Sequence, residues 1–387
     1  MKIVLAPNAF KGCLSAAQAC RAMAEGVRRA VPDCEIVQVP FSDGGDGLVD
    51  VFLELLGAEA RRAEVTGPRG EPMDSQFGFL PGRRLAAVEM AKASGLALLQ
   101  EGRRDPMLTT TYGTGELIRQ ALDCGAESLV IGIGGSATND GGTGMAAALG
   151  IRFYDQHGQS FVPQGGQDLP RIKRLDAQGL DPRLRQTRLQ VVCDVDNPLL
   201  GDTGAARVYG PQKGAGPDQV EELESGMVNL AAVIQQDLGL DVRSVPGGGA
   251  AGGLGAGLAA FLGARLRSGV EVMLEVVGLK DRLQGANCLL TAEGRADSQL
   301  AFGKGPAGVG RCAAEQGIPC FLLAGSVAED CPDLSSWGLS AVVSICQEPC
   351  SLEQALARAG TNLGRSTEQV VRIFLSGRLD GSNPTRA

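Results

Sequence analysis

The alternation of short apolar runs with helical patterns at both ends of the chain constrains the fold more than any other feature. Near the N-terminus this pattern predicts strands and helices at 2–7, 16–30, 35–41 and 48–56. From residue 287 the alternation returns, with predicted elements at 288–291, 305–316, 319–324, 341–345 and 352–374. Strands that alternate with helices favour a parallel sheet with helices on its faces.

The middle of the chain follows another pattern, in which several strands come one after another. Predicted strands and helices lie there at 61–66, 73–80, 85–90, 115–124, 128–133, 189–193, 217–238 and 250–266. The chain has 387 residues, and a single core usually stops growing at roughly 250–300 residues. We therefore expect a Rossmann-like α/β parallel-sheet domain of residues 1–63 and 285–387, interrupted by a larger inserted mixed α/β domain of residues 64–284.

Glycine is unusually frequent, and other residue types are informative by their scarcity. The chain holds 56 glycines without a Gly-X-Y period, which indicates many tight turns or backbone brought close to a ligand. The single histidine, His157, lies in a polar turn and argues against Ser-His-Asp hydrolysis and multi-histidine zinc sites. A net charge of -8 lacks the electrostatic footprint of a nucleic-acid binder.

Cysteine usage and hydropathy bear on the compartment. The 11 cysteines include no Cys-x-x-Cys pair, which is typical of a reducing compartment. The first residues do not read as a signal peptide, and the longest uncharged run, 244–264, is too rich in glycine for a membrane span. We expect a cytoplasmic protein without a membrane or nucleic-acid partner, and the sequence leaves its oligomeric state open.

Five polar segments that contain glycine follow predicted strands directly, where ligands bind in α/β sheets. They are residues 7–12, 42–47, 132–142, 193–198 and 291–299. These segments and the residues after them supply positive charge at Lys11, Arg295 and Lys304, and carboxylates that include Asp43, Asp194 and Asp297. Glycine amides, cations and Mg²⁺-binding carboxylates are the groups that phosphoryl transfer requires. No Walker A sequence is present, so a P-loop nucleotide site is excluded.

Each of these features also has a structural interpretation. The 134–142 loop is either a tight strand-to-helix connection or a phosphate site, and the helix expected after it favours the phosphate site. Asp43 is typical of turns as well as of catalysis, whereas Asp194, at the end of a buried strand, favours a functional role. Lys11, taken without its neighbours, fits a plain surface charge as well as it fits a role in a phosphate site. Residues 246–253 fit a phosphate cradle or close helix packing equally well.

A rival motif lies at residues 132–137, which match G-x-G-x-x-A after a strand, with Asp155 about 20 residues further on as in dinucleotide-binding sites. Residues 138–142 intrude before the helix. Only about residues 143–149 then remain for a helix, too few for the crossover to a parallel strand. We therefore discount the dinucleotide interpretation.

Taken together, the motifs resemble the bacterial glycerate kinase family of the class I type, from about residue 6 to residue 325. The matching segments are 10–12, 43–47, 132–142, 194–199, 210–215, 247–257 and 293–295. The chain departs from the family pattern at Asn8, where Asp is usual, and at Ala292 and Gly305. Asn8 keeps an acceptor oxygen but loses the charge, so weaker activity or a shifted substrate preference is expected.

The resemblance implies phosphorylation of D-glycerate with ATP and Mg²⁺, mainly to 2-phosphoglycerate, at an active site in the interdomain cleft. It also carries our assignment of site residues. The catalytic candidates are Asp194, Lys11, Asp43 and Arg295. The ATP-binding candidates are Gly134, Gly135, Ser136, Asn139, Asp140 and Lys304. The metal candidates are Asp194, Asp43 and Asp297.

Three alternatives stay open. The first is phosphorylation at the 3-hydroxyl, since the 2-hydroxyl rests on the resemblance alone. The second is an NAD(P)-linked hydroxyacid oxidoreductase that uses the motif at 132–137. The third is a non-catalytic sensor of a small acid, although the number of carboxylates exceeds what binding one acid requires.

Overall fold

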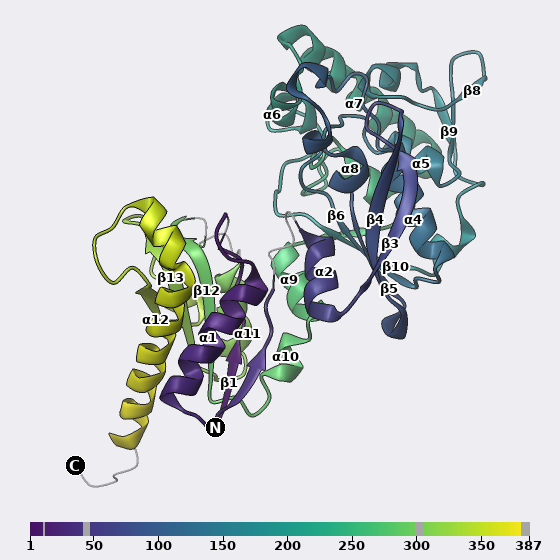
Figure 1. The fold of residues 1–387 in the computed structure, drawn as a ribbon. Coiled ribbons are helices and arrows are strands. Elements are labelled where there is room, and N and C mark those ends of the chain that lie inside the picture. Colours follow the sequence, from purple (N-terminus) through teal and green to yellow (C-terminus); the bar gives the residue numbers. More distant parts are fainter. Residues whose placement is uncertain (11, 42–46, 299, 301–304, 381–387) are drawn as a thin grey trace. The chain divides into compact units, whose positions relative to one another are not determined.

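The computed structural model describes residues 1–387 except 11, 42–46, 299, 301–304 and 381–387 (Figure 1). The chain forms two compact units. Unit 1 consists of residues 1–43 and 270–387, and unit 2 consists of residues 44–269. The inserted unit is thus continuous in sequence, whereas unit 1 is assembled from both ends of the chain.

Unit 1 contains a parallel sheet of five strands in the order β14-β13-β12-β1-β2. The strands are β1 (Lys2–Leu5), β2 (Glu35–Gln38), β12 (Cys288–Ala296), β13 (Cys320–Val327) and β14 (Leu339–Ser344). The helices of this part of the chain are α1 (Ala16–Ala30), α9 (Gly269–Val276), α10 (Leu279–Arg282), α11 (Pro306–Ala314) and α12 (Leu352–Asp380). Helix α9 begins at the boundary between the units. The predicted strand and helix alternation at both ends of the chain is confirmed.

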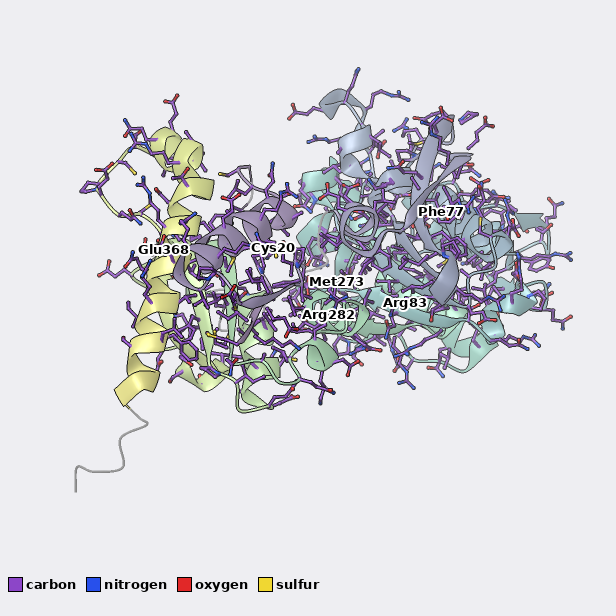
Figure 2. All side chains as sticks on the ribbon, turned by 60° about the horizontal axis from the view of Figure 1, so that its bottom comes forward. Cys20, Phe77, Arg83, Met273, Arg282 and Glu368 are labelled. Carbon is purple, nitrogen blue, oxygen red and sulfur yellow. The ribbon has the colours of Figure 1, made fainter. Side chains whose placement is uncertain are left out.

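Helices α1 and α12 lie side by side on one face of this sheet (Figure 1). A capping box starts α1, because the Ser15 side chain accepts from the Gln18 N–H and the Gln18 side chain accepts from the Ser15 N–H. The helices approach so closely that a Cβ on Gly26 would come within 2.9 Å of the Thr367 Cβ. Figure 2 labels Glu368 on α12, whose carboxylate pairs with the Arg29 guanidinium at 2.8 Å. The N- and C-terminal segments of the chain therefore share one core.

Unit 2 contains a mixed sheet of six strands in the order β11-β10-β6-β5-β4-β3. The strands are β3 (Glu59–Thr66), β4 (Pro72–Leu80), β5 (Leu85–Glu89), β6 (Ser128–Gly132), β10 (Arg188–Val192) and β11 (Arg265–Arg267). Strands β5, β6, β10 and β11 are parallel, whereas β3 and β4 are antiparallel to their neighbours. The helices are α2 (Leu48–Leu56), α3 (Ala91–Ser94), α4 (Tyr112–Asp123), α5 (Thr143–Ala148), α6 (Ala205–Tyr209), α7 (Pro217–Leu238) and α8 (Leu254–Leu262).

A second, small sheet in unit 2 shows which strand follows the dinucleotide-like motif at residues 132–137. Strand β7 (Arg152–Tyr154) pairs antiparallel with β8 (Ser160–Phe161) and β9 (Arg174–Asp176). After β6 the chain thus passes through the short helix α5 into a different sheet, and it returns to the parallel strand beside β6 only at β10, after the strands of that second sheet. Asp155 accepts from the backbone N–H groups of His157 and Gln159 and so shapes a turn. The predicted absence of a dinucleotide crossover is confirmed.

The two units differ from the expected domains in where some elements fall. Helix α2 packs on β4 and β5, and β3 pairs with β4, so both lie in unit 2. The sequence pattern placed α2 with residues 1–63 because it follows β2 in the usual β-α order. The boundaries at 63/64 and 284/285, and the cleft between the domains, stay predictions. No helix in the described ranges is both long and apolar enough to cross a membrane.

Candidate active site

The predicted phosphate loop and Asp194 lie together because their strands are neighbours. Strands β6 and β10 are parallel and adjacent, so the residues that follow them emerge at the same sheet edge. Residues after each strand line a pocket of about 300 Å³, here called the glycine-loop pocket. Its lining includes Gly134, Gly135, Ser136, Asp194, Tyr209 and Gln212.

The loop after β6 contributes Gly134, Gly135 and Ser136 to the lining of this pocket. Gly135 has a φ of 70°, a left-handed conformation that glycine adopts without strain. The loop is held in place by bonds from the Leu96 N–H to the Gly135 carbonyl, at 2.8 Å, and from the Ala137 N–H to the Ser94 carbonyl, at 2.9 Å. Within the described part of the chain, the N–H groups of Gly134, Gly135 and Ser136 have no hydrogen-bond acceptor. Such amides are suited to bind phosphate or carboxylate oxygens.

Asp194 supplies a carboxylate to the same pocket. Its Oδ1 atom accepts a hydrogen bond from the Gly269 N–H at 2.9 Å, which orients the side chain. The Tyr209 hydroxyl, on the opposite lining, donates to Asn197 Oδ1 at 2.7 Å. The pocket thus combines donors for an anion with one carboxylate that can hold a proton or a cation.

Asp140, predicted to bind the nucleotide, is instead completely buried beneath the loop. Its Oδ2 accepts from the Thr111 N–H and hydroxyl at 2.8 Å each and from the Gly144 N–H at 3.3 Å, and its Oδ1 accepts from the Gly142 N–H at 3.1 Å. Burial raises the pKa of this carboxyl group, and these hydrogen bonds act in the opposite direction. Asp140 therefore holds the loop against α4 and α5.

Lys213 is the buried cation of the same region. Its side chain is 1% exposed, and its Nζ donates to the Thr138 carbonyl at 2.7 Å. Burial lowers the pKa of Lys213 to about 7, and the negative charge of Asp140 opposes this shift. The ammonium group thus fixes the loop backbone two residues beyond Ser136.

The glycine-rich run at 247–253 packs against this loop. The Gly252 carbonyl accepts from the Gly141 N–H at 3.0 Å, and a Cβ on Gly252 would overlap the Thr138 carbonyl oxygen. Of the two interpretations held level for this run, close packing is the one that these contacts favour. Ala250 and Ala251, from the same run, line the glycine-loop pocket.

Unit 1 carries a second and larger pocket, of about 830 Å³, at the carboxyl ends of its strands. We call it the β1–β12 pocket, because residues 8–10 after β1 and residues 293–295 of β12 form its centre. Gly325 of β13, Ile345 after β14 and one face of α12 complete the lining. Carboxyl ends of parallel strands are the usual ligand sites of such sheets.

The polar side chains of this pocket include two predicted site residues. Arg295 Nε lies 3.3 Å from Asp297 Oδ2, with the arginine side chain 67% exposed and the aspartate 24%. Asn8 Oδ1 accepts from the N–H of Ala9 at 2.8 Å, so the residue that departs from the family pattern shapes its own turn. Near Asn8 lies Gly305, the residue that begins α11.

The structure thus brings the predicted site residues together in two groups. Gly134, Gly135, Ser136 and Asp194 share the glycine-loop pocket, and Arg295 and Asp297 share the β1–β12 pocket. Asn139, like Asp140, is fully buried and does not line either pocket. Lys11, Asp43 and Lys304 lie outside the described residues.

The metal candidates belong to both groups, Asp194 to unit 2 and Asp297 to unit 1. Among the residues that the structure describes, no three His, Cys, Asp or Glu side chains cluster as a complete metal site. Mg²⁺ in kinases is usually held by one or two carboxylates together with substrate phosphates. The carboxylate of Asp194 beside exposed amides fits that requirement.

Two supporting residues escaped prediction from the sequence. Glu89, buried at the end of β5, accepts from the N–H groups of Gly47 and Val49 at 3.0 and 2.9 Å and fixes the start of α2 after the 43–47 motif. Lys213 lies within the 210–215 segment that carried the resemblance, but its burial has no sequence signal. Apolar neighbours could have pointed to Glu89, since a carboxylate in a buried strand needs a partner.

Strand ends that present free amides, a carboxylate and an arginine define an α/β enzyme that acts on a small anionic molecule. Comparison with known proteins makes this class specific. The chain matches the model of the Glycerate kinase family over residues 3–375 and belongs to that family. The predicted enzyme class, a kinase, is thereby confirmed.

Relatives of known assignment cover nearly the whole chain. The glycerate 2-kinase of Escherichia coli K12 is 43% identical over 97% of this chain and 99% of its own length. The glycerate kinase of Halalkalibacterium halodurans is 42% identical over 96% of this chain and 97% of its own. A crystal structure assigned as glycerate kinase 2 from Salmonella typhimurium LT2 has a TM-score of 0.89 and 43% identity, covering 98% of this chain and 99% of that one.

Proposed function

We propose that this chain transfers the γ-phosphoryl group of ATP to D-glycerate and forms 2-phospho-D-glycerate. The observation that carries this proposal is the row of amides at Gly134–Ser136, which have no acceptor among the described residues, beside Asp194 in a chain 43% identical to a glycerate 2-kinase. Amides of this kind stabilise negative charge on phosphate oxygens without reorganising during the reaction. The choice of the 2-hydroxyl is supported by the Escherichia coli relative.

In this mechanism the N–H groups of Gly134, Gly135 and Ser136 donate to phosphate oxygens of ATP. The glycerate hydroxyl oxygen bonds to the γ-phosphorus as the bond to the β-phosphate oxygen breaks, and ADP leaves. Asp194 either accepts the hydroxyl proton or holds Mg²⁺, with Asp43 in the complementary role.

Cationic side chains and the metal complete the proposed machinery. Arg295 and Lys11 hold the glycerate carboxylate or the transferring phosphoryl group, for which the guanidinium of Arg295 is suited by its paired donors. Asp297 and Lys304 are further candidates for Mg²⁺ and for ATP. When bound, Mg²⁺ neutralises charge on the phosphate oxygens.

The test is ATP turnover with D-glycerate, read as ADP release and as the phosphorus NMR spectrum of the product. We expect the phosphorus signal of a 2-phosphoester, whereas a 3-phosphoester would overturn the regiochemistry alone. The absence of glycerate-dependent ADP release with Mg²⁺ would overturn the kinase proposal.

Asp194→Asn tests the central carboxylate, and we expect kcat to fall at least ~100-fold, the scale for loss of a positioned proton acceptor. The matched control is Asp202→Asn, at a fully exposed surface carboxylate, which should leave turnover unchanged. Near-normal turnover of Asp194→Asn would remove this residue from the mechanism.

A further inference from the structure

The β1–β12 pocket lies where the strand order of unit 1 changes direction. From β1 the chain continues to β2 on one side, whereas β12, β13 and β14 are added on the other side. Residues 8–10 after β1 and 293–295 of β12 therefore flank the topological switch point. In open α/β sheets, ligands bind in the crevice outside the strand ends at such a point.

One wall of this pocket is apolar, and two of its residues are exposed. It includes Phe10, Ile345, Leu352, Leu356 and Ala359. Leu352 is 75% exposed and Leu356 is 42% exposed, so this wall leaves large aliphatic side chains in contact with water. Removing apolar surface from water is favourable. A ligand with an apolar face would therefore gain affinity here.

Of the two substrates of the proposed reaction, only one has an apolar surface that fits this wall. Every carbon of D-glycerate carries oxygen, so glycerate has no apolar surface to place against Leu352 and Leu356. The purine of ATP has two apolar faces. The volume of about 830 Å³ also lies in the range of roughly 300–1,000 Å³ typical of sites for larger ligands.

The lining of the pocket also includes polar side chains that suit a nucleoside. The carboxylates of Glu293 and Asp297 are acceptors, as the hydroxyl groups of a ribose require. The largely exposed Arg295 also lines the pocket, and its guanidinium can meet phosphate oxygens. The apolar wall thus matches the base of a nucleotide, and the polar side chains match its ribose and phosphates.

We propose, building on the phosphoryl transfer proposed above, that the β1–β12 pocket binds the adenine base and ribose of ATP. The purine lies against the α12 wall formed by Leu352, Leu356 and Ala359. The ribose hydroxyls donate to the carboxylates of Glu293 and Asp297. In this arrangement Asp297 binds the ribose and not Mg²⁺, and of the two roles named for Arg295 above it takes the contact with a phosphoryl group and not with the glycerate carboxylate.

Cysteines at the pocket provide a direct test in the full-length protein. Cys346 and Cys350 are exposed and line the pocket, whereas Cys124 is exposed at the end of α4 in unit 2. Alkylation by iodoacetamide is followed by mass spectrometry for each peptide, with and without the non-hydrolysable β,γ-imido analogue of ATP. At about ten times its dissociation constant the analogue leaves about a tenth of the sites free, so alkylation of Cys346 and Cys350 should slow about tenfold. Cys124 should react at an unchanged rate, and D-glycerate should protect none of the three.

A pair of variants on α12 tests the same site by kinetics. Ala355 lines the pocket and is half-buried, whereas Ala357, two residues on, is exposed and lies outside it. Ala355→Trp fills the base site, and we expect the KM for ATP to rise at least about tenfold, or ~1.4 kcal/mol, with the KM for glycerate within twofold of the wild type. Ala357→Trp should leave both KM values unchanged. Thermal unfolding of both variants verifies that they fold.

The outcomes separate this proposal from the proposed function. Protection of Cys346 and Cys350 by the ATP analogue supports the nucleoside site even if wild-type protein shows no turnover with glycerate. Turnover without such protection overturns the nucleoside site and leaves the kinase function intact. Protection by D-glycerate, or a rise in the KM for glycerate in Ala355→Trp, would assign the pocket to the acceptor and overturn the proposal. If Ala355→Trp fails to fold, the cysteine protection alone decides.

Discussion

Replacement of Lys213 by Met should change how the stability of the protein depends on pH. The Lys213 ammonium group is buried beside the loop that carries the free amides, and its Nζ donates to the Thr138 carbonyl. Its pKa falls from 10.5 to about 7 because burial penalises the charged form. In the unfolded chain the same group keeps its ordinary pKa, so folding releases a proton at any pH between the two values.

The sign and the size of the effect follow from this shift. The lowered pKa of Lys213 contributes stability that is fully present above pH 10.5, the pKa of the group in the unfolded chain. This stability is lost as the pH falls through about 7, the pKa in the folded protein. At about 1.4 kcal/mol per pKa unit, the whole window corresponds to about 5 kcal/mol. Between about pH 7 and about pH 9, the free energy of unfolding of the wild type should therefore rise by about 2 kcal/mol relative to Lys213→Met.

The assay is urea unfolding followed by circular dichroism across this pH range for both proteins. Lys280→Met is the matched control, since the Lys280 side chain is 72% exposed and should show a pH-independent difference from the wild type. A difference between wild type and Lys213→Met that stays constant within about 0.5 kcal/mol from pH 7 to pH 9 would refute a buried, titrating Lys213.

Two further predictions concern the packing beneath the same loop. Asp140→Asn places an amide NH₂ group against buried donors and should lower the free energy of unfolding by about 3 kcal/mol in urea titration. The exposed control Asp202→Asn should stay within about 0.5 kcal/mol of the wild type. Equal unfolding midpoints for both variants would contradict the structural role of Asp140. Gly252→Ala should destabilise far more than Gly239→Ala, because both have positive φ but only the Gly252 Cβ would overlap the Thr138 carbonyl, and Gly239 has open space. Thermal unfolding compares the stability of the two glycine variants. For Gly239→Ala, backbone strain alone predicts a loss of about 1 kcal/mol in the free energy of unfolding. A similar loss for both variants would argue against close packing at Gly252.

Much of the fold could be predicted because the local signals agreed with the tertiary structure. The sequence patterns over 217–238 and 16–30 predicted α7 and α1 with their observed bounds. The placement of α2 could not be predicted in this way. Its amphipathic pattern specifies a helix with one buried face, and the pattern does not say which sheet covers that face.

The candidate site shows the same division. Glycines after β6 and the carboxylate after β10 could be predicted as one group, since the ends of parallel strands meet at one edge. Asp140 could not be distinguished from a ligand-binding aspartate, because its role depends on the N–H groups of Thr111, Gly142 and Gly144, which fold back on it. A polar residue in a glycine loop has the same sequence signature whether it faces a ligand or the core.

The insertion of unit 2 between the two halves of unit 1 sets an order for folding during synthesis. Helix α1 is complete at residue 30, but α12, on which it packs, begins at residue 352. At about 5–20 residues per second, the ribosome takes tens of seconds to make the intervening chain. Throughout that interval the apolar face of α1, with Met23 and Val27, lacks α12 as its partner. Unit 2, in contrast, has every strand of its larger sheet once β11 is made, before α12 begins. The nascent chain therefore completes its middle first and its beginning last.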